Sequence, residues 1–143
     1  MKTKAMPNTQ DPFNLARFVY AQWHEQACLE IREGRKKTHW MWFTFPQIAG
    51  LGTEAIEFEI SGRREAEAYL DHEILGPRLR ECSLLVSLLP KQPITDVFPD
   101  RDIRKLRSSM TLFAQVTLDN KVFMDVLTKF YGGRLDQLTL DRL

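Results

Sequence analysis

Apolar residues recur every three or four positions along most of the chain, which is the spacing of one face of an α-helix. The first stripe predicts one long helix over residues 12–33. Asp11 is a helix-capping residue, Pro12 suits the first helical position, and Gly34 is a common stop. The members of this stripe are Leu15, Phe18, Val19, Trp23, Ala27 and Ile31.

Four later stripes have the same period and predict the rest of a helical framework. One helix is expected over residues 62–71 with Ser61 as its cap, and another over residues 77–89, where Pro90 ends the stripe. A long helix follows a cap at Asp100 or Asp102, and a last one runs from a cap at Asp119 to the stop at Gly132.

The most unusual part of the chain is residues 34–52, GRKKTHWMWFTFPQIAGLG, which we call the signature segment. Three adjacent cations precede two tryptophans and two phenylalanines, and so many large rings are not all solvated cheaply. We therefore predict that Trp40 or Trp42, and Phe43 or Phe45, are anchored in the core. Pro46 limits the element to a single helical turn or a short extended piece.

Residues 53–60 fit two structures. Ile56, Phe58 and Ile60 alternate with glutamates as in a strand, but Ile56 and Ile60 are also one helical turn apart. The residues alone favour a strand, although its only plausible partner is the segment 41–45 and an isolated two-stranded ribbon is marginal.

The signature segment, together with LGPRL at residues 75–79 and KLRSSMTLF at residues 105–113, resembles a bacterial family of unknown function that is often mislabelled calpastatin in genome annotation. The resemblance implies a multihelical fold and a helix over residues 53–60. It transfers no catalytic residue, because none is established for the family. We thus predict a mainly α protein: a disordered tail over residues 1–10, and one helical domain of about five to seven helices over residues 11–143. A short extended segment near residues 41–60 is the open alternative.

Composition narrows the function classes. The 143 residues are 43% hydrophobic and 27% charged, as in an ordinary globular domain, and the net charge is +1. This charge exerts no strong pull on nucleic acid or acidic membranes, so any anion binding must be local. Nothing approaches the roughly 18 apolar residues of a membrane span, and we expect a soluble cytoplasmic protein.

The two cysteines are also typical of a cytoplasmic protein. Cys28 and Cys82 each fall in an apolar helical stripe, which favours buried reduced thiols over a disulfide. The two cysteines and three scattered histidines do not have zinc-ligand spacing, so we expect no metal and no cofactor.

Two stretches carry candidate binding residues. In the signature segment, Arg35, Lys36 and His39 can donate to phosphate or carboxylate, and Trp40 or Trp42 offers a stacking face, with Trp40 taken as the candidate. In KLRSSMT and the residue before it, the candidates are Arg104, Lys105, Ser108 and Ser109, where consecutive serines oppose local helix preference. The structural alternatives are cations at a helix end followed by core anchors, and a solvated cationic helix face.

Two functions remain open from the sequence. In the first, both stretches converge on one pocket for a small phosphorylated or nucleotide-like ligand. In the second, the domain is a non-catalytic protein–protein interaction module. An enzymatic reading has no motif support, because the sequence contains no GxSxG, Walker A or GxGxxG pattern.

Overall fold

The structure is a computed structural model that describes residues 10–52 and 55–143, so the predicted tail lies outside the described residues except for Gln10. Within these residues it has eight α-helices, five of them at least nine residues long, and two 3-10 turns. The prediction of a mainly helical protein is confirmed. In chain order the elements are α1 (Ala16–Ala21), α2 (His24–Glu33), α3 (Met41–Thr44), η1 (Ile56–Phe58), α4 (Arg63–Asp71), α5 (Leu75–Ser87), η2 (Ile94–Asp96), α6 (Asp100–Gln115), α7 (Lys121–Tyr131) and α8 (Gln137–Leu140).

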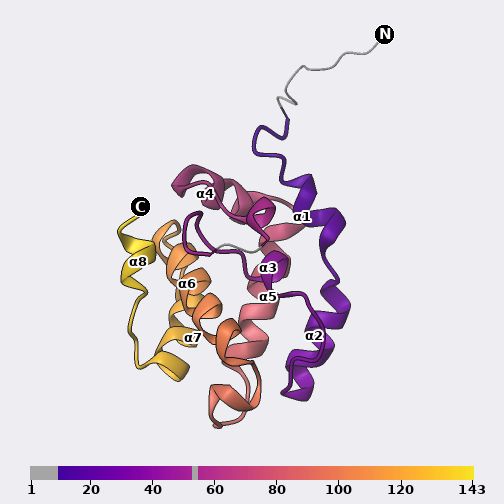
Figure 1. The fold of residues 1–143 in the computed structure, drawn as a ribbon, viewed down its shortest axis with the longest axis vertical. Coiled ribbons are helices and arrows are strands. Elements are labelled where there is room, and N and C mark those ends of the chain that lie inside the picture. The colour runs from indigo at the N-terminus through magenta and orange to yellow at the C-terminus, as the bar shows by residue number, and fades with distance from the viewer. Residues whose placement is uncertain (1–9, 53–54) are drawn as a thin grey trace.

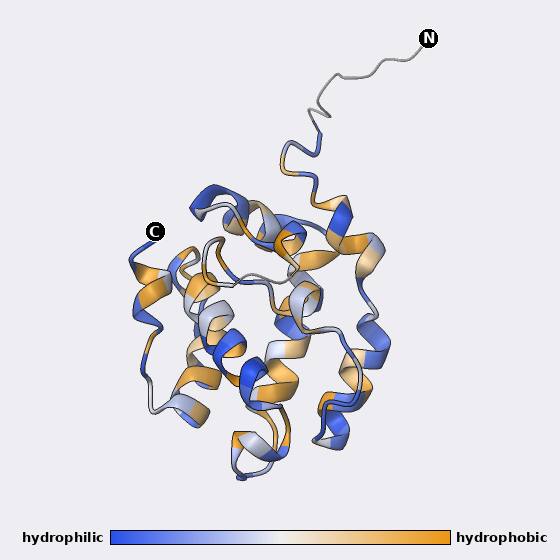
Figure 2. Cartoon of the chain, viewed as in Figure 1, coloured by the Kyte–Doolittle hydropathy of each residue, from blue (hydrophilic) through white to orange (hydrophobic). Residues whose placement is uncertain are grey.

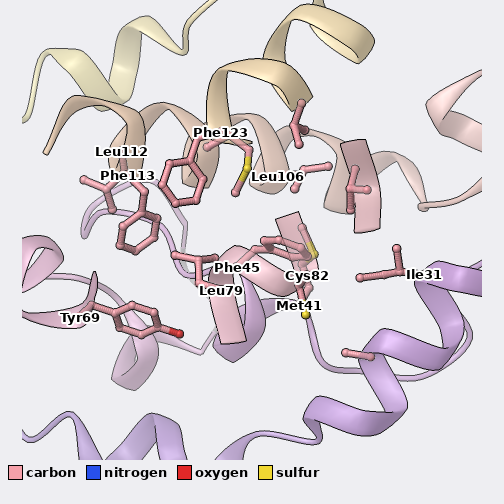
Figure 3. Close-up of a cluster of buried hydrophobic side chains, with 14 of the residues drawn as sticks. Ile31, Met41, Phe45, Tyr69, Leu79, Cys82, Leu106, Leu112, Phe113 and Phe123 are labelled. Carbon is pink, nitrogen blue, oxygen red and sulfur yellow. The ribbon is translucent and has the colours of Figure 1, made fainter. Parts of the chain in front are cut away.

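Helix α5 lies at the centre of the fold and contacts α2, α3, α4 and α7, while α6 packs on α4, α7 and α8 (Figure 1). Figure 2 shows that the helices carry both hydrophilic and hydrophobic residues, as amphipathic helices around a core do. The buried side chains form one cluster, and Figure 3 shows Leu79 and Cys82 of α5 between residues of the neighbouring helices.

The predicted first helix is wrong in two respects: it is two helices, and the first of them begins at Ala16 rather than at Pro12. The chain leaves helical geometry at Gln22 and Trp23 between α1 and α2. The Gln22 amide explains the break: its Nε2 donates to the Phe43 carbonyl at 2.6 Å and to Tyr69 Oη at 3.0 Å. The interruption also turns Trp23 outward, so this member of the apolar stripe is exposed. Asp11 is not the N-cap, because Leu15 precedes α1; its carboxylate instead accepts from the backbone N–H groups of Leu15 and Ala16 at the start of the helix.

The ambiguous stretch after the signature segment is neither a regular helix nor a strand in the residues described. Residues 53–54 lie outside them, Ile56–Phe58 form the 3-10 turn η1, and Ile60 makes an isolated parallel bridge with Ile48. The backbone N–H of Ile60 donates to Gln47 at 2.9 Å, and its carbonyl accepts from Ala49 at 2.8 Å. The segment 41–45 is therefore not the partner of this stretch, because it forms the helical turn α3.

Three predicted helix caps are corrected by the structure. Gly62, not Ser61, precedes α4, and the Ser61 N–H instead donates to the buried Glu65 carboxylate at 2.9 Å. Helices α6 and α7 begin after Pro99 and Asn120, and neither cap residue makes a side-chain capping bond. The C-terminal stop at Gly132 is confirmed, with left-handed φ of 61°.

Helix α5 begins two residues earlier than predicted, and Gly76 makes this start feasible. A Cβ added at Gly76 would overlap the Leu70 carbonyl oxygen and lie 2.9 Å from the Leu70 carbonyl carbon. We expect Gly76→Ala to lower the free energy of unfolding by roughly 1–3 kcal/mol, the usual cost of overpacking, as measured by urea denaturation. Gly62→Ala is the matched control, because nothing lies within 4 Å of a Cβ there. Equal midpoints for the two variants would contradict the close approach.

The two cysteines are buried free thiols, as predicted. They lie on facing helices, Cys28 on α2 and Cys82 on α5, with their sulfur atoms 3.9 Å apart. In the part of the chain that the structure describes, none of the helices combines the length and apolar character needed to cross a bilayer.

Candidate functional site

One carboxylate shapes the first half of the signature segment. Glu30, on the last turn of α2, is almost completely buried and accepts five hydrogen bonds. Oε1 accepts from the backbone N–H groups of Lys37 (2.6 Å) and Thr38 (3.0 Å) and from Trp40 Nε1 (2.8 Å). Oε2 accepts from Thr38 Oγ1 and Gln26 Nε2, each at 2.7 Å. The chain after α2 therefore wraps around this side chain.

The ionised form of Glu30 is strongly favoured. Burial alone would raise the pKa of its carboxyl group, but the hydrogen bonds from Gln26, Lys37 and Thr38 outweigh burial and lower the pKa to about 2. Glu30 is thus charged at all physiological pH values. Its charge is satisfied by donors of the signature segment, which ties the conformation of that segment to the end of α2.

A buried ion cluster joins the signature segment to α6. Lys36 Nζ lies 3.0 Å from Asp102 Oδ2, and Lys105 Nζ lies 3.7 Å from Asp102 Oδ1. The Lys36 and Asp102 side chains are only 6% and 3% exposed. Since two ammonium groups share one carboxylate, the cluster keeps one positive charge in excess. Each ammonium also lies over an indole ring, Lys36 at 5.4 Å from the Trp40 centroid and Lys105 at 4.7 Å from that of Trp42.

Next to this cluster lies a cavity of about 350 Å³ between three parts of the chain. The signature segment, α6 and the C-terminal region around α8 each supply one wall. The lining includes four cationic side chains and one carboxylate, in a protein whose net charge is +1. The lining residues are Trp42, Gln47, Leu51, Gly52, Arg101, Arg104, Lys105, Arg107, Ser108, Asp136 and Leu138.

Helical spacing explains why the cations gather on one wall. On α6, Arg104, Lys105 and Ser108 follow Arg101 by three, four and seven positions, so the four side chains share one face of the helix. Arg101 and Arg104 are exposed. Arg107 instead binds the C-terminal segment, because its guanidinium donates to the carbonyls of Arg134 at 2.9 Å and Leu135 at 2.7 Å.

Asp136 sets the third wall in place. Its Oδ2 accepts from Ser108 Oγ at 2.8 Å and from Thr139 Oγ1 at 2.6 Å, and its backbone N–H donates to Thr111 Oγ1 at 2.9 Å. These bonds fasten the start of α8 to α6. A carboxylate has about four acceptor positions, so Asp136 retains capacity to accept from a ligand hydroxyl.

Comparison with known proteins identifies a family and a solved structure that are similar to this chain. The family described as proteins of unknown function, DUF1810, matches residues 12–143. The chain belongs to this family. The crystal structure of the conserved hypothetical protein Rv1873 from Mycobacterium tuberculosis is similar at 49% sequence identity, with a TM-score of 0.91. The match covers 93% of this chain and 98% of that one. A comparison with curated proteins finds no match.

Membership in DUF1810 supplies a fold but no chemistry, so the candidate residues are judged by their positions. Arg104, Lys105 and Ser108 line the cavity together. Arg35 and His39 are exposed and do not line it, because Glu30 draws the chain between them around the end of α2. The remaining candidates are Lys36, which is paired with Asp102, and Trp40 and Ser109, which are fully buried.

The cavity also contains Arg101 and Asp136, which the candidate set from the sequence left out. Of the two tryptophans that the sequence offered as a stacking face, Trp42 lines the cavity and Trp40 is fully buried. Arg101 shares the α6 face, so its helical spacing was an available signal. Asp136 comes from the far end of the chain, and no local pattern pointed to it.

Proposed function

We propose that this DUF1810 protein binds a small phosphorylated ligand, of sugar-phosphate or nucleotide size, in the cavity between the signature segment, α6 and α8. The observation that carries the proposal is the local excess of cations: Arg101, Arg104, Lys105 and Arg107 line one cavity with a single carboxylate. Since the whole chain has a net charge of only +1, this excess is a property of the site.

The parts of the cavity suit different parts of such a ligand. The exposed guanidinium groups of Arg101 and Arg104 present planar donor forks that match the oxygens of a phosphate. The Trp42 indole offers an apolar ring face, and Asp136 offers a carboxylate for hydroxyl groups such as those of a sugar. A volume of about 350 Å³ is near the lower end for ligand pockets, which favours a small molecule.

The excess positive charge of the cluster of Lys36, Lys105 and Asp102 also favours a phosphorylated ligand. Lys105 belongs both to the cavity lining and to the cluster with Asp102 and Lys36. Its ammonium, held against Trp42 and shielded from water, interacts with a nearby anion more strongly than a solvated ammonium does. Lys36 thus contributes through Asp102 rather than by contact with the ligand.

The test is a thermal-shift screen of the purified chain against sugar phosphates, nucleotides, ADP-ribose-type compounds and inorganic phosphate, each beside its unphosphorylated counterpart. Phosphorylated compounds are expected to raise the melting temperature, because a ligand that binds only the native state stabilises it. No shift with any phosphorylated compound, at concentrations up to the millimolar range, would refute the proposal.

Arg104→Ala is expected to weaken binding of the best phosphorylated compound by roughly 10- to 100-fold, because a hydrogen bond to a charged group contributes about 1.5–3 kcal/mol. The unliganded melting temperature should barely change, since Arg104 is exposed. Arg35→Ala is the matched control: an exposed arginine outside the cavity, whose loss should leave affinity unchanged. Calorimetric titration of the two variants decides the matter, and equal affinities would show that the anion lies elsewhere.

A further inference from the structure

Outside the lining of the cationic cavity, three metal-ligating side chains converge between α2 and α5. The ligand atoms of His24, Cys28 and Cys82 all lie within 4.8 Å of one another. His24 and Cys28 are one turn apart on the same face of α2, and Cys82 faces them from α5. The expectation that the chain has no metal site was based on sequence spacing alone. Spacing does not reveal that Cys82, on another helix, lies beside His24 and Cys28.

The distances between these atoms have the size of a metal coordination shell. The two sulfur atoms are 3.9 Å apart, and His24 Nδ1 lies 3.9 Å from Cys28 Sγ and 3.8 Å from Cys82 Sγ. With bonds of about 2.3 Å to sulfur and about 2.1 Å to nitrogen, a tetrahedral zinc ion separates two sulfurs by about 3.8 Å and a sulfur from a nitrogen by about 3.6 Å. The three atoms therefore span nearly one face of a zinc tetrahedron.

The surroundings of His24 match the outer shell of such a site. Its Nε2 lies 2.7 Å from Glu81 Oε1, and the other Glu81 oxygen lies 3.7 Å from the Arg32 guanidinium. A carboxylate that accepts from one ring nitrogen fixes the proton there and leaves the other nitrogen as a ligand, an arrangement common to zinc-bound histidines. His24 is the first residue of α2 and its side chain is 16% exposed. Its Nε2 lies 3.5 Å from Cys28 Sγ, so binding of a metal through Nδ1 requires the ring to turn.

We infer that His24, Cys28 and Cys82 form a binding site for a borderline-soft cation, with Zn²⁺ as its ligand and Glu81 as the residue that orients His24. Two thiolates and an imidazole select zinc over magnesium or calcium, which prefer oxygen ligands. This inference is independent of the proposed phosphate site, because the two sites share no residue.

The test is a titration of the reduced, chelator-treated full-length chain with Co²⁺, a spectroscopic probe of zinc sites. We expect saturation at one equivalent, an intense sulfur-to-cobalt charge-transfer absorption, the visible bands of tetrahedral cobalt, and displacement by one equivalent of Zn²⁺. Magnesium should not displace the cobalt. A folded wild-type chain that gives no charge-transfer band, or that is isolated with Cys28 and Cys82 joined in a disulfide and binds no metal after reduction, would overturn the inference.

Variants separate this site from adventitious binding. Cys28→Ala and Cys82→Ala should each reduce the charge-transfer intensity and weaken cobalt binding at least tenfold. His24→Ala tests the same site without altering a fully buried residue, and should weaken binding by a similar factor even if a cysteine variant fails to fold. Glu81→Gln should weaken it roughly 10-fold. His39→Ala, which removes an exposed histidine outside the cluster, is the control. Cobalt binding that is unchanged in His24→Ala would refute the assignment.

Discussion

Replacing Glu30 with alanine is expected to lower the free energy of unfolding by at least about 3 kcal/mol. The side chain is 1% exposed and is the common acceptor for two backbone N–H groups and for the Trp40 indole. A buried donor left without an acceptor costs about 1–3 kcal/mol, and Glu30→Ala removes the acceptor of all five donors, of which the Trp40 indole N–H is fully buried. Urea denaturation measures the effect. Glu33→Ala, an exposed carboxylate on the same helix, should change the midpoint little.

The same carboxylate predicts a specific acid sensitivity. Its pKa in the folded protein is lowered from 4.5 to about 2, so its stabilising contribution is complete above about pH 5 and is lost as the pH falls toward 2. Glu30→Gln keeps the shape but does not titrate. The stability difference between wild type and Glu30→Gln should therefore be constant near neutral pH and should shrink in acid, with Glu33→Gln as control. A difference that stays the same from pH 7 to pH 3 would contradict a titrating Glu30.

The helices of this protein could largely be predicted from the sequence, because each stripe of apolar residues reports one buried face. The break between α1 and α2 could not. Local spacing is continuous across Gln22 and Trp23, and the interruption is caused by hydrogen bonds from the Gln22 amide to Phe43 and Tyr69, more than 20 positions away. The isolated bridge between Ile48 and Ile60 also depends on a contact between residues distant in the sequence, and no local pattern indicates which residue pairs with which.

In the candidate site, too, features set by local spacing could be predicted from the sequence, and features set by distant contacts could not. The cationic face of α6 was predictable, because Arg104, Lys105 and Ser108 lie at helical spacing. The position of the cations at residues 35–37 was not, because Glu30 folds that stretch back onto α2 and directs Lys36 inward to Asp102. The two basic stretches could therefore be recognised in the sequence. Which of their side chains reach the cavity depends on the buried carboxylates Glu30 and Asp102.

The two tryptophans of the signature segment should respond very differently to substitution. Trp40→Ala is expected to lower the free energy of unfolding by about 3–5 kcal/mol, because the ring is fully buried between Phe45 and Phe98 and its Nε1 donates to Glu30. Trp42→Ala should cost no more than about 2 kcal/mol, since its ring is only partly buried. It should instead weaken the binding of a phosphorylated nucleoside, because Trp42 lines the cavity.

Trp40→Phe separates packing from hydrogen bonding at the buried position. Phenylalanine retains much of the buried ring but has no N–H for Glu30, so we expect a loss of about 1–3 kcal/mol, smaller than that of Trp40→Ala. Because Trp40 and Glu30 share a hydrogen bond, the double variant Trp40→Ala with Glu30→Ala should be less destabilised than the sum of the two single variants. Additive losses in urea denaturation would show that the indole and the carboxylate stabilise the fold independently, contrary to the network around Glu30.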